Sequence, residues 1–249
     1  DRINDFLAAD PDYTHHDDLS DFLTAVQNGS IDNNWGNPGP NDNVQPDQIN
    51  FSIMAPGTIF TMAGEQYRYL ENMSSGNHLI IRNDSFLGEG VFQQDNRLNT
   101  WYAALDPAVQ AMTQPVADSF DTGVVAHADI VWEGQNRWLP ANLHAFPEVE
   151  ADITQVDPSG SPRAFALSLA DVVRLSGPGR AFTDFSNRAT DQGQNDGWLL
   201  RTLTVVSGHR VWTVGASFHN LQGRLNGGGY DTGALAPSRG VRPAIIVHQ

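Results

Sequence analysis

The chain of 249 residues contains no cysteine, and this absence limits how its fold can be held together. Disulfide bonds and cysteine-ligated zinc, which stabilise many small domains, are both excluded. Hydrophobic residues make up 40% of the sequence, which is enough for a chain of this length to bury a core of its own. The sequence therefore predicts a globular domain stabilised by packing, and not a disordered segment.

All 14 basic side chains are arginine, so lysine is absent as well. A Walker A motif, a protein-kinase site and Schiff-base chemistry each require a lysine. The sequence also lacks a Gly-x-Ser-x-Gly nucleophile elbow and a His-Glu-x-x-His zinc helix. We therefore predict a protein that is not an enzyme. Glycosidase carboxylate pairs have no fixed spacing, however, so a glycan-cleaving activity stays open as an alternative.

The 29 acidic residues outnumber the arginines and give a formal net charge of -15. Long-range repulsion from a phosphate backbone argues against nucleic acid as a partner. No apolar run reaches the roughly 18 residues that a transmembrane helix needs, so we predict no membrane span in this chain. A strongly acidic surface suits a protein in a salty medium, and we expect an extracellular or cell-surface location.

No cofactor is predicted from the composition, although calcium stays open. Asp outnumbers Glu by 23 to 6, and short aspartate side chains in loops could ligate calcium, but a solvated acidic surface explains the same excess. The run 15–18, His-His-Asp-Asp, combines imidazole and carboxylate donors, but neighbouring helical residues point in different directions. His127 and Asp129 would share one face of a strand, and no third ligand is visible. We therefore expect no metal site in either place.

The first fifty residues have the pattern of an arm that precedes the main domain. An apolar stripe at helical spacing predicts a helix that ends at Asn28-Gly29. The stripe consists of Leu19, Phe22, Leu23 and Val26. Residues 32–48 are rich in Asn, Asp, Pro and Gly and predict an irregular linker. We therefore predict a helical arm with its linker at residues 1–50 and the main domain at residues 51–249.

Short apolar runs separated by Gly and Asn turns predict antiparallel strands in the main domain. The runs are 58–62, 67–70, 78–82, 198–201, 210–214 and 241–247. One short helix is expected from about Asn99, and a second at Asp106, an N-cap followed by proline. Another helix begins at Ser168, which has capping-box spacing to Asp171. The sequence predicts an α+β fold of short antiparallel strands with a few short helices.

Two motifs stand out in the C-terminal third. Gly-Trp-Leu-Leu-Arg occupies 197–201, and Gly-Val-Arg-Pro-Ala occupies 240–244, with a glycine-rich segment between them. In this order they resemble a bacterial family of uncharacterised domains in surface and secreted proteins, similar in fold to C-type lectins and formylglycine-generating enzymes. The resemblance spans roughly Gly57 to His248 and implies a C-type-lectin-like domain. The oxidation performed by formylglycine-generating enzymes requires cysteine, so the resemblance does not imply that activity here.

In related receptor domains, the binding surface lies on the loops between the tryptophan-containing strand and the final strand, which match residues 205–239 here. The resemblance therefore implies ligand-binding roles for a mixture of aromatic and polar residues. These are His209, Trp212, Phe218, His219, Asn220, Arg224, Tyr230 and Asp231. For Trp212 and Phe218 a core position is equally compatible. Structural roles are expected for Trp198, Arg201 and Arg242, the last by donating to backbone carbonyls.

We expect a non-enzymatic extracellular binding or adhesion module that recognises a protein or a glycan through residues 205–239. The alternative is the structural head domain of an extracellular, pilin-like filament or of a surface-layer subunit. In that case, residues 1–50 would mediate self-association. The two hypotheses therefore differ in which part of the chain makes the functional contact.

Overall fold

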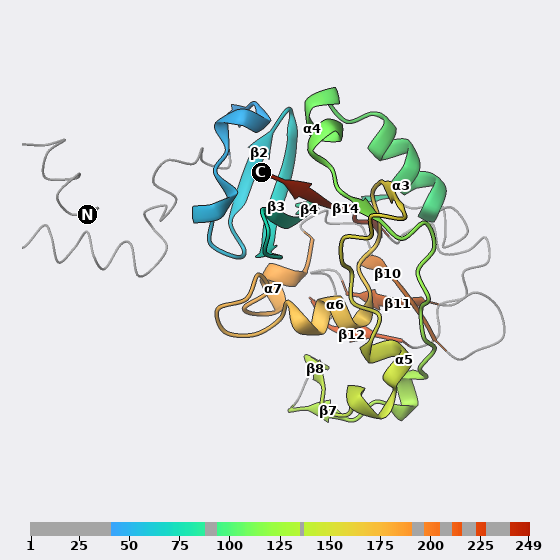
Figure 1. The fold of residues 1–249 in the computed structure, drawn as a ribbon. Helices are drawn as coiled ribbons and strands as arrows, with labels where there is room; N and C mark the ends of the chain where they lie inside the picture. Colours follow the sequence, from blue (N-terminus) through green and yellow to red (C-terminus); the bar gives the residue numbers. More distant parts are fainter. Residues whose placement is uncertain are drawn as a thin grey trace, which may run out of the picture. The chain divides into compact units, whose positions relative to one another are not determined.

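The computed structural model describes residues 41–87, 94–134, 137–190, 197–204, 211–215, 223–227 and 240–249 (Figure 1). The chain divides into two units, Asp1–Gly36 and Asn37–Gln249. The predicted helix of the arm lies in the first unit, outside the described residues. The described part is mixed helix and sheet, with few helices and several small, mainly antiparallel sheets, as the α+β prediction requires.

The first sheet joins the start of the described chain to its C-terminal end. Its strands are β1 (Asn43–Val44), β2 (Ile59–Met62), β3 (Glu65–Asn72), β4 (Asn77–Arg82) and β14 (Ala244–His248), in the order β1-β2-β3-β4-β14. All neighbouring pairs are antiparallel except β1 and β2. The last strand of the chain thus pairs with a strand formed early in the sequence.

The main domain begins before residue 51, which corrects the predicted boundary. Asn43 pairs with Thr61 across β1 and β2, and the Ile49 side chain is buried in the core beside Phe51. The composition of residues 32–48 suggested a linker because Asn, Pro and Gly are common in irregular chain. Here part of that irregular chain packs against the sheet and so belongs to the domain.

The first sheet is buried on both faces at β4 and β14. Ile80 and Ile245 belong to one core cluster with side chains of α3 (Gln94–Ala103) and α4 (Pro107–Met112). Leu79 and Ile246 belong to a second cluster with α6 (Leu169–Arg174). Successive side chains on a strand point to opposite faces, so a strand that is covered on both faces must be apolar throughout. This explains the unbroken apolar runs of β4 and β14.

Local capping signals fixed two of the helix starts. The Asp106 side chain accepts a hydrogen bond from the amide of Ala108, 2.8 Å away, and Pro107 opens α4. Ser168 and Asp171 form the capping box that starts α6. α3 instead begins at Gln94, earlier than predicted. The hydroxyl of Thr100 donates to the carbonyl of Asn96 inside this helix, so it does not mark a helix start.

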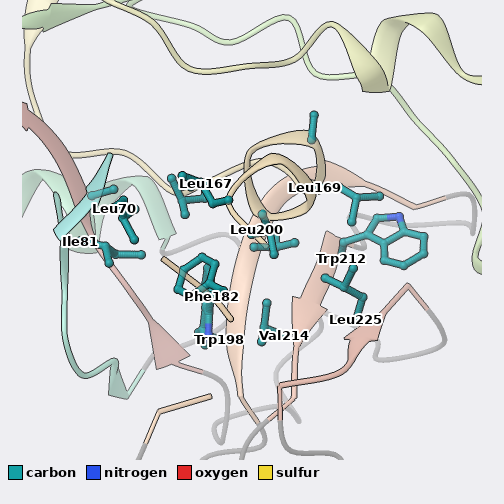
Figure 2. Close-up of a cluster of buried hydrophobic side chains, with 14 of the residues drawn as sticks. Leu70, Ile81, Leu167, Leu169, Phe182, Trp198, Leu200, Trp212, Val214 and Leu225 are labelled. Atoms are coloured by element: carbon teal, nitrogen blue, oxygen red, sulfur yellow. The ribbon is translucent and has the colours of Figure 1, made fainter. Parts of the chain in front are cut away.

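The second sheet carries the C-terminal motifs. Its strands are β5 (Phe86–Leu87), β10 (Trp198–Leu203), β11 (Val211–Val214), β12 (Leu225–Asn226) and β13 (Gly240–Val241), in the order β12-β11-β10-β13-β5. Only β10 and β13 pair in parallel. Figure 2 shows side chains of β10, β11 and β12 in one core cluster with those of Leu167 and Phe182.

The remaining elements are short. They are η1 (Pro46–Gln48), η2 (Phe51–Ile53), β6 (Pro115–Val116), η4 (His127–Asp129), β7 (Trp132–Glu133), β8 (Leu139–Pro140), η5 (Leu143–Ala145), α5 (Pro147–Glu150), β9 (Ser161–Pro162) and α7 (Phe185–Arg188). Between β8 and β9 the chain forms η5 and α5. Among the described residues, none of the helices has the length and apolar character that crossing a membrane would require.

Candidate ligand-binding edge of the second sheet

Strand pairing defines two ends of the second sheet. Trp198 lies opposite Val214, and Val214 lies opposite Leu225. β10 therefore ends where β11 begins and where β12 leaves the sheet, and we call this the Thr204 end. The opposite end, which we call the Gly197 end, holds the start of β10 and the connection from β11 to β12. The length of β11 separates the two ends by about 13 Å.

This topology attaches the predicted ligand-binding residues to both ends. Residues 205–210 connect β10 to β11 at the Thr204 end, and residues 216–222 connect β11 to β12 at the Gly197 end. Residues 228–239 start at the Thr204 end and finish at the Gly197 end, because Gly240 of β13 lies opposite Trp198. Within these segments, and outside the described residues, are His209, Phe218, His219, Asn220, Tyr230 and Asp231. The attachment points therefore do not form a single cluster of loops.

Trp212 belongs to the core, which corrects the expectation that it contacts a ligand. Its side chain has 0% exposure, and its Nε1 donates to the carbonyl of Val125, 3.0 Å away. In Figure 2 its ring lies among the side chains of the core cluster near Leu225. A side chain buried on all sides cannot reach a ligand in this structure, so the alternative core position is the correct one.

Arg224 lies at the Gly197 end, directly before β12. It is half-buried, and its carbonyl accepts a hydrogen bond from the amide of Gly215 at 2.8 Å. The amide of Gly223 in turn donates to the carbonyl of Gly215 at 2.9 Å. These two bonds close the connection between β11 and β12, so the backbone of Arg224 helps to hold the hairpin together.

A cluster of three rings lies at the Thr204 end. The ring centroids of His127 and Trp132, and those of His127 and Trp212, are 5.6 Å apart, while Trp132 and Trp212 are separated by 6.1 Å. His127 and Trp132 are half-buried. The Gly227 amide donates to Nδ1 of His127 at 3.0 Å, and a Cβ at Gly227 would lie 2.5 Å from the Trp212 ring. Only glycine permits this close approach of backbone to indole.

The attachment points of the strands at the Thr204 end are held in place. The hydroxyl of Thr204 donates to the carbonyl of Gly227 at 2.8 Å, and the amide of Val125 donates to the carbonyl of Leu203 at 3.2 Å. Val124 and Leu203 form a β-bridge, and their side chains are exposed to 47% and 37%. We define the Trp132 surface as the side chains of His127 and Trp132, which lie against the buried Trp212. Val124 and Leu203 are exposed at the same end of the sheet, but Leu203 lies opposite Val211 and therefore points to the face opposite Trp212.

Arg201 lies in a buried ion network behind β10. Its guanidinium is 2.6 Å from Oδ1 of Asp152 and 3.2 Å from Oδ2 of Asp171, and it stacks over the Phe120 ring at 4.0 Å. Burial raises the pKa of Asp171, but the charge of Arg201 and hydrogen bonds from Thr154 outweigh burial and hold that pKa below its usual value. The network links α6 to β10 and has a structural role.

Arg242 and Trp198 meet at the carbonyl of Arg188. Arg242 Nη1 and Trp198 Nε1 donate to it at 3.3 Å and 3.0 Å, and Arg242 Nε donates to the Arg82 carbonyl at 2.9 Å. The Arg188 side chain is itself buried, donates to the carbonyls of Gly223 and Trp138, and stacks over the Trp138 ring at 3.9 Å. Burial lowers the pKa of Arg188 to about 9. Arg188 thus braces the second sheet.

Two hollows lie beside the first sheet. One has a volume of about 510 Å³ and includes Asn50, Asn72 and His78, and the other has a volume of about 580 Å³ and includes Asp47. Gln249 contributes to both. Their walls come from η1, η2, α4 and the ends of the first-sheet strands, so they are separate from the Trp132 surface.

The described residues contain no group of three or more His, Asp or Glu side chains placed to hold a metal ion. The run 15–18 lies outside them, and Nδ1 of His127 is engaged by the Gly227 amide. Comparisons with protein-family models, with curated proteins and with solved structures found no match. Function must therefore be inferred from the residues of the chain itself.

Sequence reasoning missed the ring cluster. His127 was considered only as a metal ligand, and no role was assigned to Trp132. η4 and β7 are too short to show any hydrophobic period, and the contact of His127 with Gly227 spans 100 residues. The turn at Gly134, which follows Trp132, is the local signal that could have pointed to a hairpin here.

The stability of the domain is expected to fall as the pH is lowered below about 6.5, the ordinary pKa of histidine. Burial and the charge of Arg137 lower the pKa of His127, and burial and His248 lower that of His78. The unfolded chain then binds protons that the folded chain does not, so acid favours unfolding. The melting temperature should therefore decrease as the pH is lowered from about 7.5 to about 5.5.

The matched variants for this experiment are His127→Asn and His144→Asn. Asparagine keeps an acceptor near the position of Nδ1 of His127 but does not titrate, so the melting temperature should depend less on pH in His127→Asn. His144 is exposed, so its replacement controls for the loss of one imidazole and should change the melting temperature little. A melting temperature that stays constant or rises toward the lower pH would contradict the prediction.

Proposed function

We propose that this protein is a non-enzymatic extracellular binding module that recognises a protein or a glycan at the Thr204 end of the second sheet. The observation that carries the proposal is the Trp132 surface. It places two half-buried rings next to the attachment points of residues 205–210 and 228–239. Aromatic and apolar anchors of this kind contribute most of the binding energy in many interfaces.

The support beneath the Trp132 surface is suited to recognition. Trp212 is fully buried under His127, and Thr204, Gly227 and Val125 are linked to their neighbours by backbone or side-chain hydrogen bonds. A site built on such fixed elements loses little conformational entropy when a ligand binds. Specificity would then come from residues 205–210 and 228–239, which include His209, Tyr230 and Asp231.

The C-type-lectin-like fold is part of the same proposal. It is supported by two mainly antiparallel sheets, by the closing strand β14 within the first sheet, and by the long connections among β10, β11, β12 and β13. An extracellular or cell-surface location is supported by the net charge of -15 and by a core that needs no reduced thiol. The fold alone would not define the ligand, because one fold hosts many functions.

The variant Leu203→Asp tests the proposed function. A carboxylate at this position would place a charge beside the start of residues 205–210 at the Thr204 end, so affinity for the ligand should fall at least about tenfold. Ligands would first be selected on arrays of purified glycans and of extracellular proteins, and affinities would then be measured by biolayer interferometry. The melting temperature should change little, since Leu203 is already 37% exposed.

The matched control is Ile53→Asp. Ile53 has a similar exposure of 41% but lies in η2, beside the first sheet. The Ile53→Asp variant should bind the ligand with the same affinity as the unmodified protein. If the unmodified protein binds nothing on either array, or if the two variants bind equally well, the Thr204 end is not the binding site.

A further inference from the structure

We infer that the Trp132 surface binds an uncharged sugar ring, with Trp132 stacking against the apolar face of the ring and His127 donating a hydrogen bond from Nε2 to a hydroxyl oxygen. The inference rests on the proposed function and names the ligand class for the same site. It follows from the protonation state of one histidine, from the ring beside it and from the charge of the surroundings.

The structure determines which nitrogen of His127 carries the proton. The Gly227 amide lies 3.0 Å from Nδ1, and a backbone amide can only donate a hydrogen bond. Nδ1 must therefore accept with its lone pair, and the neutral imidazole carries its proton on Nε2. Burial lowers the pKa of His127 and favours this neutral form at physiological pH.

The Nε2 donor is available to a ligand. Within the part of the chain that the structure describes, the hydrogen-bond partner of the His127 side chain is Gly227. Nε2 is not one of the buried polar atoms that lack a partner, and the ring is half-buried, so solvent reaches this atom. An oriented N–H group next to solvent is ready to donate to an oxygen acceptor.

The neighbour of this donor is the Trp132 ring, whose centroid is 5.6 Å from that of His127. Trp132 rests on the buried Trp212 and is half-buried, so part of its indole stays accessible. A flat apolar ring beside a fixed N–H donor complements a ligand that has an apolar face and polar groups on its rim. A pyranose ring has C–H groups on its face and hydroxyl groups around it.

Charge separates this ligand from the alternatives. Asp129 and Glu133 lie in the elements that carry His127 and Trp132, and both are exposed; these two carboxylates outnumber the guanidinium of Arg137, whose charge also reaches His127. Together with the net charge of -15 they repel sulfated or carboxylated sugars. A simple cation has no acceptor for the hydrogen on Nε2, so it could not use this donor. An uncharged ligand with oxygen acceptors remains.

The experiment uses the full chain on a glycan array that carries neutral, sulfated and sialylated oligosaccharides. A neutral oligosaccharide that binds would then be titrated by calorimetry against three variants. His127→Asn keeps an acceptor for the Gly227 amide but lacks the outward donor, and its affinity should be about tenfold lower. Trp132→Ala removes the stacking face and should lower affinity at least about tenfold, with Trp132→Phe between it and the unmodified protein.

The control for the histidine is His248→Asn. His248 lies in β14 of the first sheet, and its Nδ1 lies 3.1 Å from Oδ1 of Asn77. Asparagine at this position keeps a polar atom near the position of Nδ1, as it does at position 127. The affinity of this variant for the sugar should equal that of the unmodified protein. Thermal melting of each variant separates loss of binding from loss of folding.

Two results would overturn the inference and leave the proposed function in place. The first is full affinity in both His127→Asn and Trp132→Ala while Leu203→Asp still loses binding. The second is binding that is confined to charged glycans or to proteins and that Leu203→Asp still weakens. If no ligand of any class binds, or if Leu203→Asp binds like the unmodified protein, the proposed function itself fails.

Discussion

Replacing Trp212 with alanine is expected to destabilise the domain by about 3 to 5 kcal/mol, because the change removes a large, fully buried side chain from the core. The cavity would adjoin Leu225 and Val125, and the carbonyl of Val125 would lose the indole donor 3.0 Å away. Urea unfolding followed by circular dichroism measures the effect. Ligand affinity should fall as well, because His127 and Trp132 rest on this ring.

Two further variants separate the causes. Trp212→Phe keeps most of the apolar volume but removes Nε1, so it should cost about 1 to 3 kcal/mol. Val131→Ala removes a side chain that is 59% exposed and should change stability by less than about 0.5 kcal/mol. If Trp212→Ala kept full stability and lost only ligand binding, Trp212 would be a surface anchor and the core assignment would be wrong.

Arg201→Met is expected to destabilise the protein by about 3 to 5 kcal/mol, since it leaves the buried carboxylates of Asp152 and Asp171 without their shared cation. Arg180→Met, at an exposed position, should change stability by less than about 0.5 kcal/mol. The measurement is again urea unfolding, at neutral pH.

A second variant tests the electrostatic reason for this loss. Changing Asp152 to asparagine in the Arg201→Met background removes a buried charge that has lost its cation, whereas Asp171 keeps its ion pair with Arg174. Part of the lost stability should therefore return. No recovery would mean that packing of Arg201 against Phe120, and not its charge, causes the loss. A cost of less than about 1 kcal/mol for Arg201→Met alone would contradict the network's structural role.

The sequence predicted those parts of the fold that depend on local chemistry. The N-cap at Asp106 and the capping box of Ser168 were predicted because their partners lie within three residues. Strand positions were predicted from short apolar runs bounded by turns. The start of α3 was misplaced because Thr100, a good capping residue by type, bonds within the helix.

The candidate site was less accessible to sequence reasoning. β11 is buried along its whole length, so alternation of apolar and polar residues could not show whether Trp212 faces solvent or core. His127 and Gly227 are 100 residues apart, and the hydrogen bond between them exists only because the strands pair as they do. The division of residues 205–239 between two ends of a sheet likewise depends on strand order, which the residue pattern does not encode.

The position of β14 has a consequence for how the protein is made. β14 pairs with β4 and supplies Ile245 and Ile246 to both faces of the first sheet, although Arg242, just before it, lies 160 residues after Arg82. A ribosome adds about 5 to 20 residues per second, so β14 is synthesised roughly 10 to 30 seconds after β4. Until then, β4 lacks the strand that pairs with it in the folded protein. During that time its open edge and apolar faces need protection, and a chaperone that holds nascent chains would supply it.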